Sequence, residues 1–133
     1  MKTESIKMSV VIPATPETIY KAWLNSKQHC EMTGAKAKVT PRIHSKFTAW
    51  DEYISGKNLE LEAGKRILQS WRTTEFPDEA EDSLLEIVLK KKGTGTELFL
   101  KQWNIPFGQS KGYKQGWIDF YFDPMQEYFG DKK

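Results

Sequence analysis

The chain has 133 residues, one cysteine, and a formal net charge of +2 from twenty basic and eighteen acidic residues. This length suits a single domain over residues 1–133, large enough to bury a sizeable core without metals or crosslinks. The lone Cys30 excludes an intrachain disulfide, and the balanced charge argues against a nucleic-acid-binding protein.

The first third of the chain favours one strand followed by two helices. Alternating apolar residues predict a strand over about residues 4–12. Thr15 as a cap and Pro16 at the first helical position predict a helix directly afterwards. A second short helix is expected over 26–34, where Gly34 suits the C-terminal cap. No apolar run is long enough for a signal peptide or a membrane span, so we expect a cytoplasmic protein.

The middle of the chain reads as a series of strands separated by turns. The expected strands cover approximately residues 36–43, 46–50, 53–62, 65–73, 83–92 and 95–103. A change of alternation near Lys57 and Asn58 predicts a bulge that would curve the sheet. The acidic stretch around Pro77 is expected to be a solvated loop.

A long aromatic helix is expected from Ser110 onwards. Its apolar residues recur with helical spacing at Tyr113, Trp117, Phe120, Tyr121, Met125, Tyr128 and Phe129. Pro124 cannot donate to the carbonyl of Phe120, so we expect a kink or break there. The α+β order of one strand, two helices, six strands and a helix predicts a curved antiparallel sheet of about seven strands wrapped around the C-terminal helix.

Several local strings occur in an order and spacing typical of one protein family. They are PATPETIYKAW (13–23), ISG (54–56), LEAGKRI (61–67), SWR (70–72), GTEL (95–98), IP (105–106), GW (116–117) and YFG (128–130). Together they resemble the START-like helix-grip proteins (SRPBCC superfamily), in the family named for the activator of the 90-kDa heat-shock-protein ATPase. The ending is especially similar to the C-terminal domain of the eukaryotic activators.

Two features depart from the pattern of that family. Many relatives have paired glycines and an Asp-Gly pair where this chain has His44-Ser45 and Asp51-Glu52, so we expect turns of different type or length. The eukaryotic activators also carry a separate domain before this module. We therefore expect that this module does not stimulate the chaperone ATPase fully by itself.

Candidate catalytic and metal-binding residues are sparse. His29 and His44 are the only histidines, and no HExxH, paired-cysteine or phosphate-loop motif occurs. We interpret His29 as a surface side chain and Cys30 as a partly buried thiol, and we expect no catalytic residue, metal or cofactor. An enzyme such as a cyclase or hydrolase is the third-ranked hypothesis. Its few candidate polar residues are Arg72, Gln102 and Tyr121.

The five tryptophans suggest two roles for the space between the sheet and the last helix. The simpler role is a packed core, because aromatic stripes are usually buried. The resemblance implies another, because in helix-grip relatives this space is often a pocket for an apolar small molecule. The lining residues we expect are Trp71, Trp103, Trp117 and Tyr121. The leading hypothesis is thus a non-enzymatic binding module, and the alternative is a co-chaperone that binds the 90-kDa heat-shock protein weakly through its surface.

Overall fold

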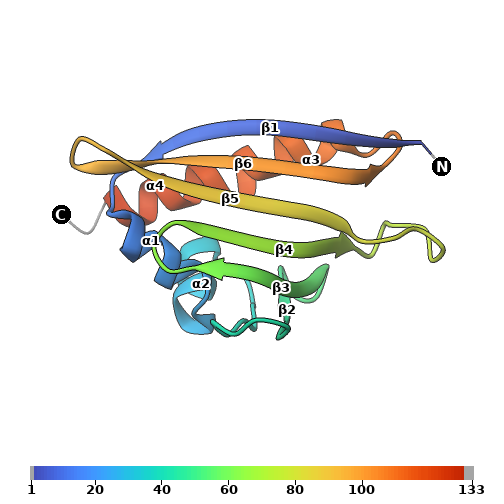
Figure 1. Ribbon diagram of the computed structural model, residues 1–133, viewed down its shortest axis with the longest axis horizontal. Coiled ribbons are helices and arrows are strands. Elements are labelled where there is room, and N and C mark those ends of the chain that lie inside the picture. The colour runs from blue at the N-terminus through green and yellow to red at the C-terminus, as the bar shows by residue number, and fades with distance from the viewer. Residues whose placement is uncertain (1, 131–133) are drawn as a thin grey trace.

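One curved antiparallel sheet carries the long C-terminal helix along one face, behind β1, β6 and β5 in the view of Figure 1. The computed structural model describes residues 2–130. Its elements are β1 (Thr3–Ile12), α1 (Pro16–Trp23), α2 (Ser26–Thr33), β2 (Lys46–Ala49), β3 (Ile54–Glu62), β4 (Arg66–Thr73), β5 (Ser83–Lys92), β6 (Gly95–Pro106), α3 (Ser110–Trp117), a π-helical segment (Ile118–Phe122) and α4 (Asp123–Gly130). The helix-grip architecture expected from the sequence is confirmed.

The sheet has six strands in the order β1-β6-β5-β4-β3-β2, with every neighbouring pair antiparallel. The bulge expected near Asn58 is confirmed, because the register of β3 against β4 shifts between Asn58 and Glu60. The extra residue bends the strand and increases its twist, which helps the sheet to curve around the helix.

The seventh strand expected over 36–43 does not form. This segment makes only one bridge to the sheet, between Lys38 and Thr48. Side chains bond several of its other backbone groups. Ser26 Oγ bonds both the N–H and the carbonyl of Val39, and the Asn58 amide donates to the carbonyls of Thr40 and Arg42.

The turns that lack glycine nevertheless adopt the left-handed conformation. The φ angles are 70° at His44, 57° at Asp51 and 74° at Glu52, and Trp50 next to them has a φ of 51°. Only glycine enters this region without steric cost, so these turns carry backbone strain. The strain concentrates between β2 and β3.

The C-terminal helix is interrupted just before Pro124, where a kink or break was expected. One turn before the proline the helix widens into the π segment, in which the Asp123 N–H donates to the carbonyl of Ile118. This i to i−5 bond shifts the pairing just where proline removes a donor, so the chain continues as α4.

The two short helices lie at one end of the sheet, where α1 packs against α2 and α2 against α4 (Figure 1). Thr15 caps α1 by accepting from the Thr18 N–H, and Gly34 ends α2 with a φ of 81°. None of the helices within residues 2–130 has the length and apolar character needed to cross a membrane.

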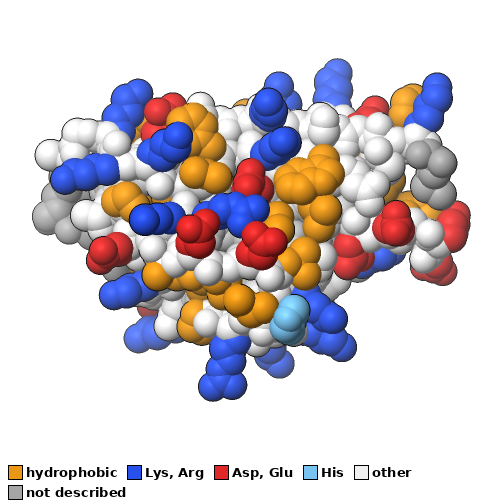
Figure 2. Space-filling model, in the orientation of Figure 1, with side chains coloured by type: hydrophobic (Ala, Val, Ile, Leu, Met, Phe, Trp, Pro, Cys, Tyr) orange, Lys and Arg blue, Asp and Glu red, His pale blue; other side chains and the backbone are white. Residues whose placement is uncertain are grey.

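The face of the molecule in Figure 2 carries interspersed basic, acidic and hydrophobic side chains. On this sheet Arg66 forms ion pairs with Glu60 and Glu86, the latter at 2.7 Å. Opposite charges are thus placed side by side on neighbouring strands, as cross-strand pairing favours.

Candidate functional site

A cavity of about 290 Å³ lies between the sheet and the C-terminal helix. Its wall is formed by Trp50, Tyr53, Ile54, Trp71, Tyr113, Gly116, Trp117, Phe120 and Tyr121. Seven of these nine residues are aromatic, and none carries a formal charge. The turn between β2 and β3, the strands β3 and β4, and the helix from α3 into the π segment supply the lining residues.

The cavity runs from the surface into the core. At its inner end Trp71, Trp117 and Tyr121 are almost fully buried, whereas Phe120 is 53% exposed and Trp50 is half-buried. The rings of Trp50 and Phe120 meet edge to face with centroids 5.2 Å apart. These two rings therefore form the rim of the opening.

The structure brings together three of the four residues expected to line the pocket. The ring centroids of Trp71 and Trp117 are 5.5 Å apart, and those of Trp117 and Tyr121 are 4.9 Å apart. Their place on the cavity wall follows from the geometry. That they bind a ligand remains a prediction.

The expectation for Trp103 is wrong. Trp103 lies on the opposite face of the sheet, where it pairs with Leu84 of β5 and the Lys101 ammonium lies 5.4 Å from its ring centroid. Side chains of a strand alternate between the two faces, and the fully buried Gln102 takes the inward position. Its neighbour must therefore point outward.

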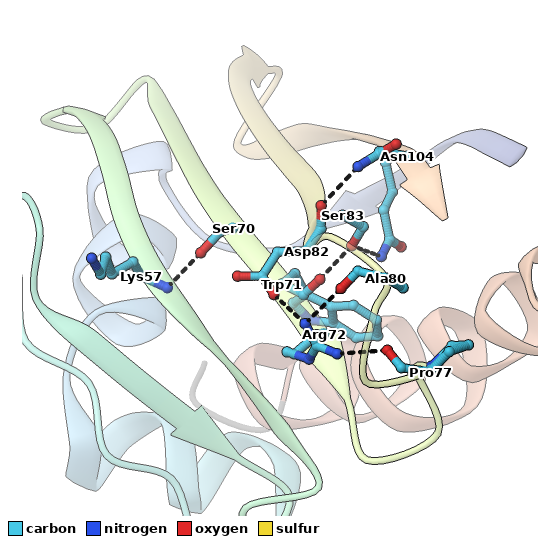
Figure 3. A network of polar contacts seen from close by, with 10 residues as sticks. Lys57, Ser70, Trp71, Arg72, Pro77, Ala80, Asp82, Ser83 and Asn104 are labelled. Carbon is cyan, nitrogen blue, oxygen red and sulfur yellow. Dashed lines mark hydrogen bonds and ion pairs between the residues drawn. The ribbon is translucent and has the colours of Figure 1, made fainter. Parts of the chain in front are cut away.

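A buried polar chain fixes the two tryptophans at the inner end of the cavity. The Trp117 indole donates to Gln102 Oε1 at 2.9 Å, and the Gln102 amide donates to Ser83 Oγ at 3.0 Å. Ser83 in turn donates to the Trp71 carbonyl at 2.6 Å, a contact drawn in Figure 3. Each polar group of this buried chain is thus paired, which avoids the cost of burying it without a partner.

A second buried chain holds the tryptophan of α1. The Trp23 indole donates to Gln69 Oε1 at 3.3 Å, and the Gln69 amide donates to Asn58 Oδ1 at 2.8 Å. Because Asn58 also holds the 36–43 segment, this chain connects the helical end of the fold with the bulge of β3.

His29 is a buried core residue and not the surface histidine that we expected. It is 4% exposed, and its Nδ1 lies 2.8 Å from the Trp23 carbonyl while its Nε2 lies 3.0 Å from the Tyr121 hydroxyl. A carbonyl only accepts, so Nδ1 carries the proton and Nε2 accepts from Tyr121. Burial lowers the pKa of His29, and the bond to Trp23 only partly opposes this effect.

The hydroxyls of the three lining tyrosines are all engaged within the fold. Tyr53 donates to the Glu75 carboxylate, Tyr113 bonds Thr73 and Gln109, and Tyr121 bonds His29. Burial raises the pKa of all three phenols, and the hydrogen bond to Glu75 raises that of Tyr53 further. They are therefore neutral at physiological pH.

Trp50 differs from the other lining residues in two respects. Its Nε1 is buried, and it is the one buried side-chain nitrogen or oxygen without a hydrogen-bond partner in the part of the chain that the structure describes. The Tyr121 hydroxyl lies near this nitrogen, but the two groups do not form a hydrogen bond. Together with the left-handed backbone, this places local strain at the rim.

Sequence reasoning missed several lining residues. Tyr113 and Phe120 belong to the helical stripe and could have been found from its period. Trp50 and Tyr53 come from a strained turn, whose direction depends on the left-handed residues between them. No local pattern indicates where such a turn points its side chains.

The polar residues considered for catalysis do not converge in the cavity. Arg72 pairs with Asp82 at 2.9 Å and donates to the carbonyls of Pro77 and Ala80, which closes the loop after β4 (Figure 3). Both functions of the Gln102 amide are occupied by Trp117 and Ser83. Within residues 2–130, no three His, Cys, Asp or Glu side chains gather closely enough to hold a metal.

Residues 13–130 match the family model described as "Activator of Hsp90 ATPase homolog 1-like protein". The chain belongs to this family. The matched residues include every element from α1 to α4, and with them the residues that line the cavity.

Two curated relatives are themselves named for the activator. The human "Activator of 90 kDa heat shock protein ATPase homolog 1" is 26% identical over 140 residues, covering 97% of this chain and 41% of that protein. The mouse protein of the same name is 25% identical over 128 residues, covering 96% of this chain and 38% of its own length. The chain thus spans well under half the length of these activator-family relatives.

Solved structures of activator-like proteins have the same fold. An HSP90 activator from Plasmodium falciparum superposes with a TM-score of 0.87 at 21% identity, covering 95% of this chain and 96% of that chain. The Aha1 dimer from Colwellia psychrerythraea gives a TM-score of 0.81 at 14% identity, with coverage of 98% and 99%. At these identities the likeness describes the fold alone.

Proposed function

We propose that this chain is a non-enzymatic binding module that takes a small apolar molecule into the aromatic cavity. The observation that supports this function is a cavity of about 290 Å³ whose nine lining residues include seven aromatic ones and no charged one. Ligand sites are typically concave and mostly apolar, with volumes of about 300–1,000 Å³. The cavity lies at the lower limit of this range, which suits a small ligand.

The absence of a charged residue from the wall argues for binding in preference to catalysis. General acid or base catalysis requires a titratable group poised near the reacting atom. The lining tyrosines are neutral and hydrogen-bonded inside the fold, and Arg72 is held outside by Asp82. These contacts favour a module that binds its ligand without changing it.

Two glycines of α3 offer a matched test of this site. Gly116 lines the cavity, and a Cβ placed there would meet only Phe120 Cδ2 at 3.8 Å. Gly112, one turn earlier, is exposed and has nothing within 4 Å of the same position. Gly116→Leu would fill the cavity, whereas Gly112→Leu would add the same side chain to the surface of the helix.

The experiment titrates each protein with the neutral fluorescent probe N-phenyl-1-naphthylamine. We expect saturable uptake at one site in the unchanged protein and in Gly112→Leu, and affinity at least about tenfold weaker in Gly116→Leu, since that side chain removes the space the probe occupies. Circular dichroism confirms that both variants are folded. Absence of saturable uptake, or equal affinities in the two variants, would overturn the proposal.

A contact with the 90-kDa heat-shock protein is the second candidate function, and membership of the activator family favours it. The segment after α2 presents the basic side chains Lys36, Lys38, Arg42 and Lys46, all exposed. None of them forms an ion pair with another described residue. This basic segment is the surface that we assign to such a contact, because unpaired exposed charges steer association.

A further inference from the structure

The aromatic wall restricts which chemical groups the cavity can accept. An anionic ligand would need donors or cations, yet the wall contains no Lys, Arg or His, and its one unpaired donor, the Trp50 indole N–H, is buried beneath the surface. A ligand rich in N–H or O–H donors would need acceptors, but the wall exposes almost only carbon, and the hydroxyls of Tyr53, Tyr113 and Tyr121 already hydrogen-bond within the fold. Burying unpaired polar groups of either kind is unfavourable. This wall therefore favours groups that need no hydrogen bond.

The ring arrangement provides an attractive electrostatic field for a cation that needs no hydrogen bond. Trp71 and Tyr113 meet at an interplanar angle of 83°, and Trp71 and Trp117 at 39°, so the rings surround the space and do not stack in one plane. The face of an aromatic ring carries partial negative charge and attracts cations, most strongly for tryptophan. Three tryptophans contribute to this wall.

A carboxylate adds negative charge beside two residues of the cavity wall, Tyr53 and Tyr113. Glu75 accepts a hydrogen bond from the Tyr53 hydroxyl, and besides burial its charge also raises the pKa of Tyr113 on the cavity wall. Arg72, the basic side chain three residues before Glu75, is paired with Asp82. The electrostatic field at this end of the cavity therefore favours positive over negative ligands.

From this combination we infer that the cavity recognises a small molecule carrying a quaternary ammonium group, through cation–π contacts with the tryptophans and the charge of Glu75. A methylated ammonium has no N–H to satisfy, and its apolar surface packs against the rings. A primary ammonium of the same size keeps N–H donors for which this mostly carbon-lined wall offers few acceptors. The inference rests on the proposed function and specifies the ligand class of the same site.

The test compares ligands of one shape and different charge. Phenyltrimethylammonium and tert-butylbenzene differ by one nitrogen in place of one carbon, and each is titrated against the unchanged protein in competition with N-phenyl-1-naphthylamine. We expect the cation to bind about tenfold more tightly than its neutral isostere, because a desolvated cation–π contact has that order of strength. Benzylamine, with a primary ammonium, and benzoate should bind more weakly than either.

A matched pair of loop variants tests the role of the carboxylate. Glu75→Gln keeps an acceptor for Tyr53 but removes the charge, and should reduce the preference for the cation by about threefold, the modest effect of an exposed charge. Asp78→Asn, on the same loop and exposed, should leave it unchanged.

The outcomes separate the two proposals. If both isosteres bind with equal affinity, the ammonium inference is overturned while the apolar-binding function stands. If neither binds and the probe is not taken up, both are overturned. A cation preference that is unchanged in Glu75→Gln would assign recognition to the rings alone and would overturn the part assigned to Glu75.

Discussion

The indole nitrogen of Trp117 donates to Gln102 Oε1 at 2.9 Å, which joins the C-terminal helix to β6 through two buried side chains. This contact lies at the inner end of the cavity, so the same residue that stabilises the helix also forms the cavity wall. The contacts that hold the helix against the sheet therefore also shape the cavity.

Replacing Trp117 should therefore destabilise the fold strongly. We expect Trp117→Ala to lower the free energy of unfolding by about 3–5 kcal/mol, the range for removing a large buried aromatic side chain. Chemical denaturation followed by circular dichroism measures the change. Trp103→Ala is the control, because this half-buried residue on the outer face should cost less than about 1.5 kcal/mol. A loss below about 1 kcal/mol for Trp117→Ala would show that the helix is not held there.

The buried His29 should make stability depend on pH. Burial lowers its pKa below the ordinary value of 6.5, whereas the unfolded chain titrates normally. Below about pH 6.5 the unfolded state thus binds more protons than the folded state, so stability falls as the pH decreases, by up to about 1.4 kcal/mol per pH unit. The stability associated with neutral His29 is fully present at pH 7.5 and is lost as the pH falls towards the folded-state pKa.

Urea denaturation between pH 7.5 and 5 measures this dependence. His29→Gln should flatten the slope because it removes the titrating group, while His44→Gln, at an exposed position, should retain the slope of the unchanged protein. Identical slopes in all three proteins would contradict the assignment to His29.

The strained turn between β2 and β3 offers a stabilising substitution. Glu52 has a φ of 74°, a conformation that costs an L-residue about 1–2 kcal/mol. Glycine removes this cost, but its greater conformational freedom in the unfolded chain lowers the stability of the fold by about 0.5–1 kcal/mol. We expect Glu52→Gly to raise the free energy of unfolding by about 0.5–1 kcal/mol in chemical denaturation.

The loop residue Asp78 is the control for that substitution. Asp78 has no positive φ, so Asp78→Gly should lower stability through the unfolded-state effect alone. Destabilisation by Glu52→Gly of the same size as by Asp78→Gly would mean that the turn is not strained.

The sequence predicted the fold because its signals are local. Alternation over 4–12, the cap at Thr15 and the helical period from Tyr113 each depend on residues within a few positions, and all three elements form as expected. The segment 36–43 has strand-like alternation too. It failed to join the sheet because Ser26 and Asn58, distant in sequence, bond its backbone instead.

The site was predicted less completely, for two different reasons. Trp103 could have been excluded from the sequence, because Leu98 and Leu100 define the inward face of β6 and Trp103 has the opposite parity. The burial of His29 could not, because its partner Tyr121 lies 92 positions away. Local sequence patterns carry no signal for a contact between residues so far apart.

Association with the 90-kDa heat-shock protein is the remaining prediction. Linking two binding modules raises avidity by about 10²- to 10⁴-fold through effective concentration. This chain spans 41% of the human activator-family relative. We therefore expect the 133-residue chain by itself to bind the cognate chaperone weakly and to stimulate its ATPase little. Calorimetric titration and an ATPase assay measure both properties.

Changes in salt concentration and reversal of surface charges identify the surface that binds the chaperone. A contact made by the exposed basic segment should weaken between low and physiological ionic strength, because exposed charges are screened over about 8 Å at 0.15 M salt. The double change Lys36→Glu with Lys38→Glu should abolish the association, while Lys90→Glu with Lys91→Glu on the far end of β5 should leave it intact. All four lysines are exposed, so neither change disturbs the core.

Tight binding that is independent of salt, or strong stimulation by this chain alone, would instead make the module a sufficient co-chaperone and reverse the ranking of the two functions.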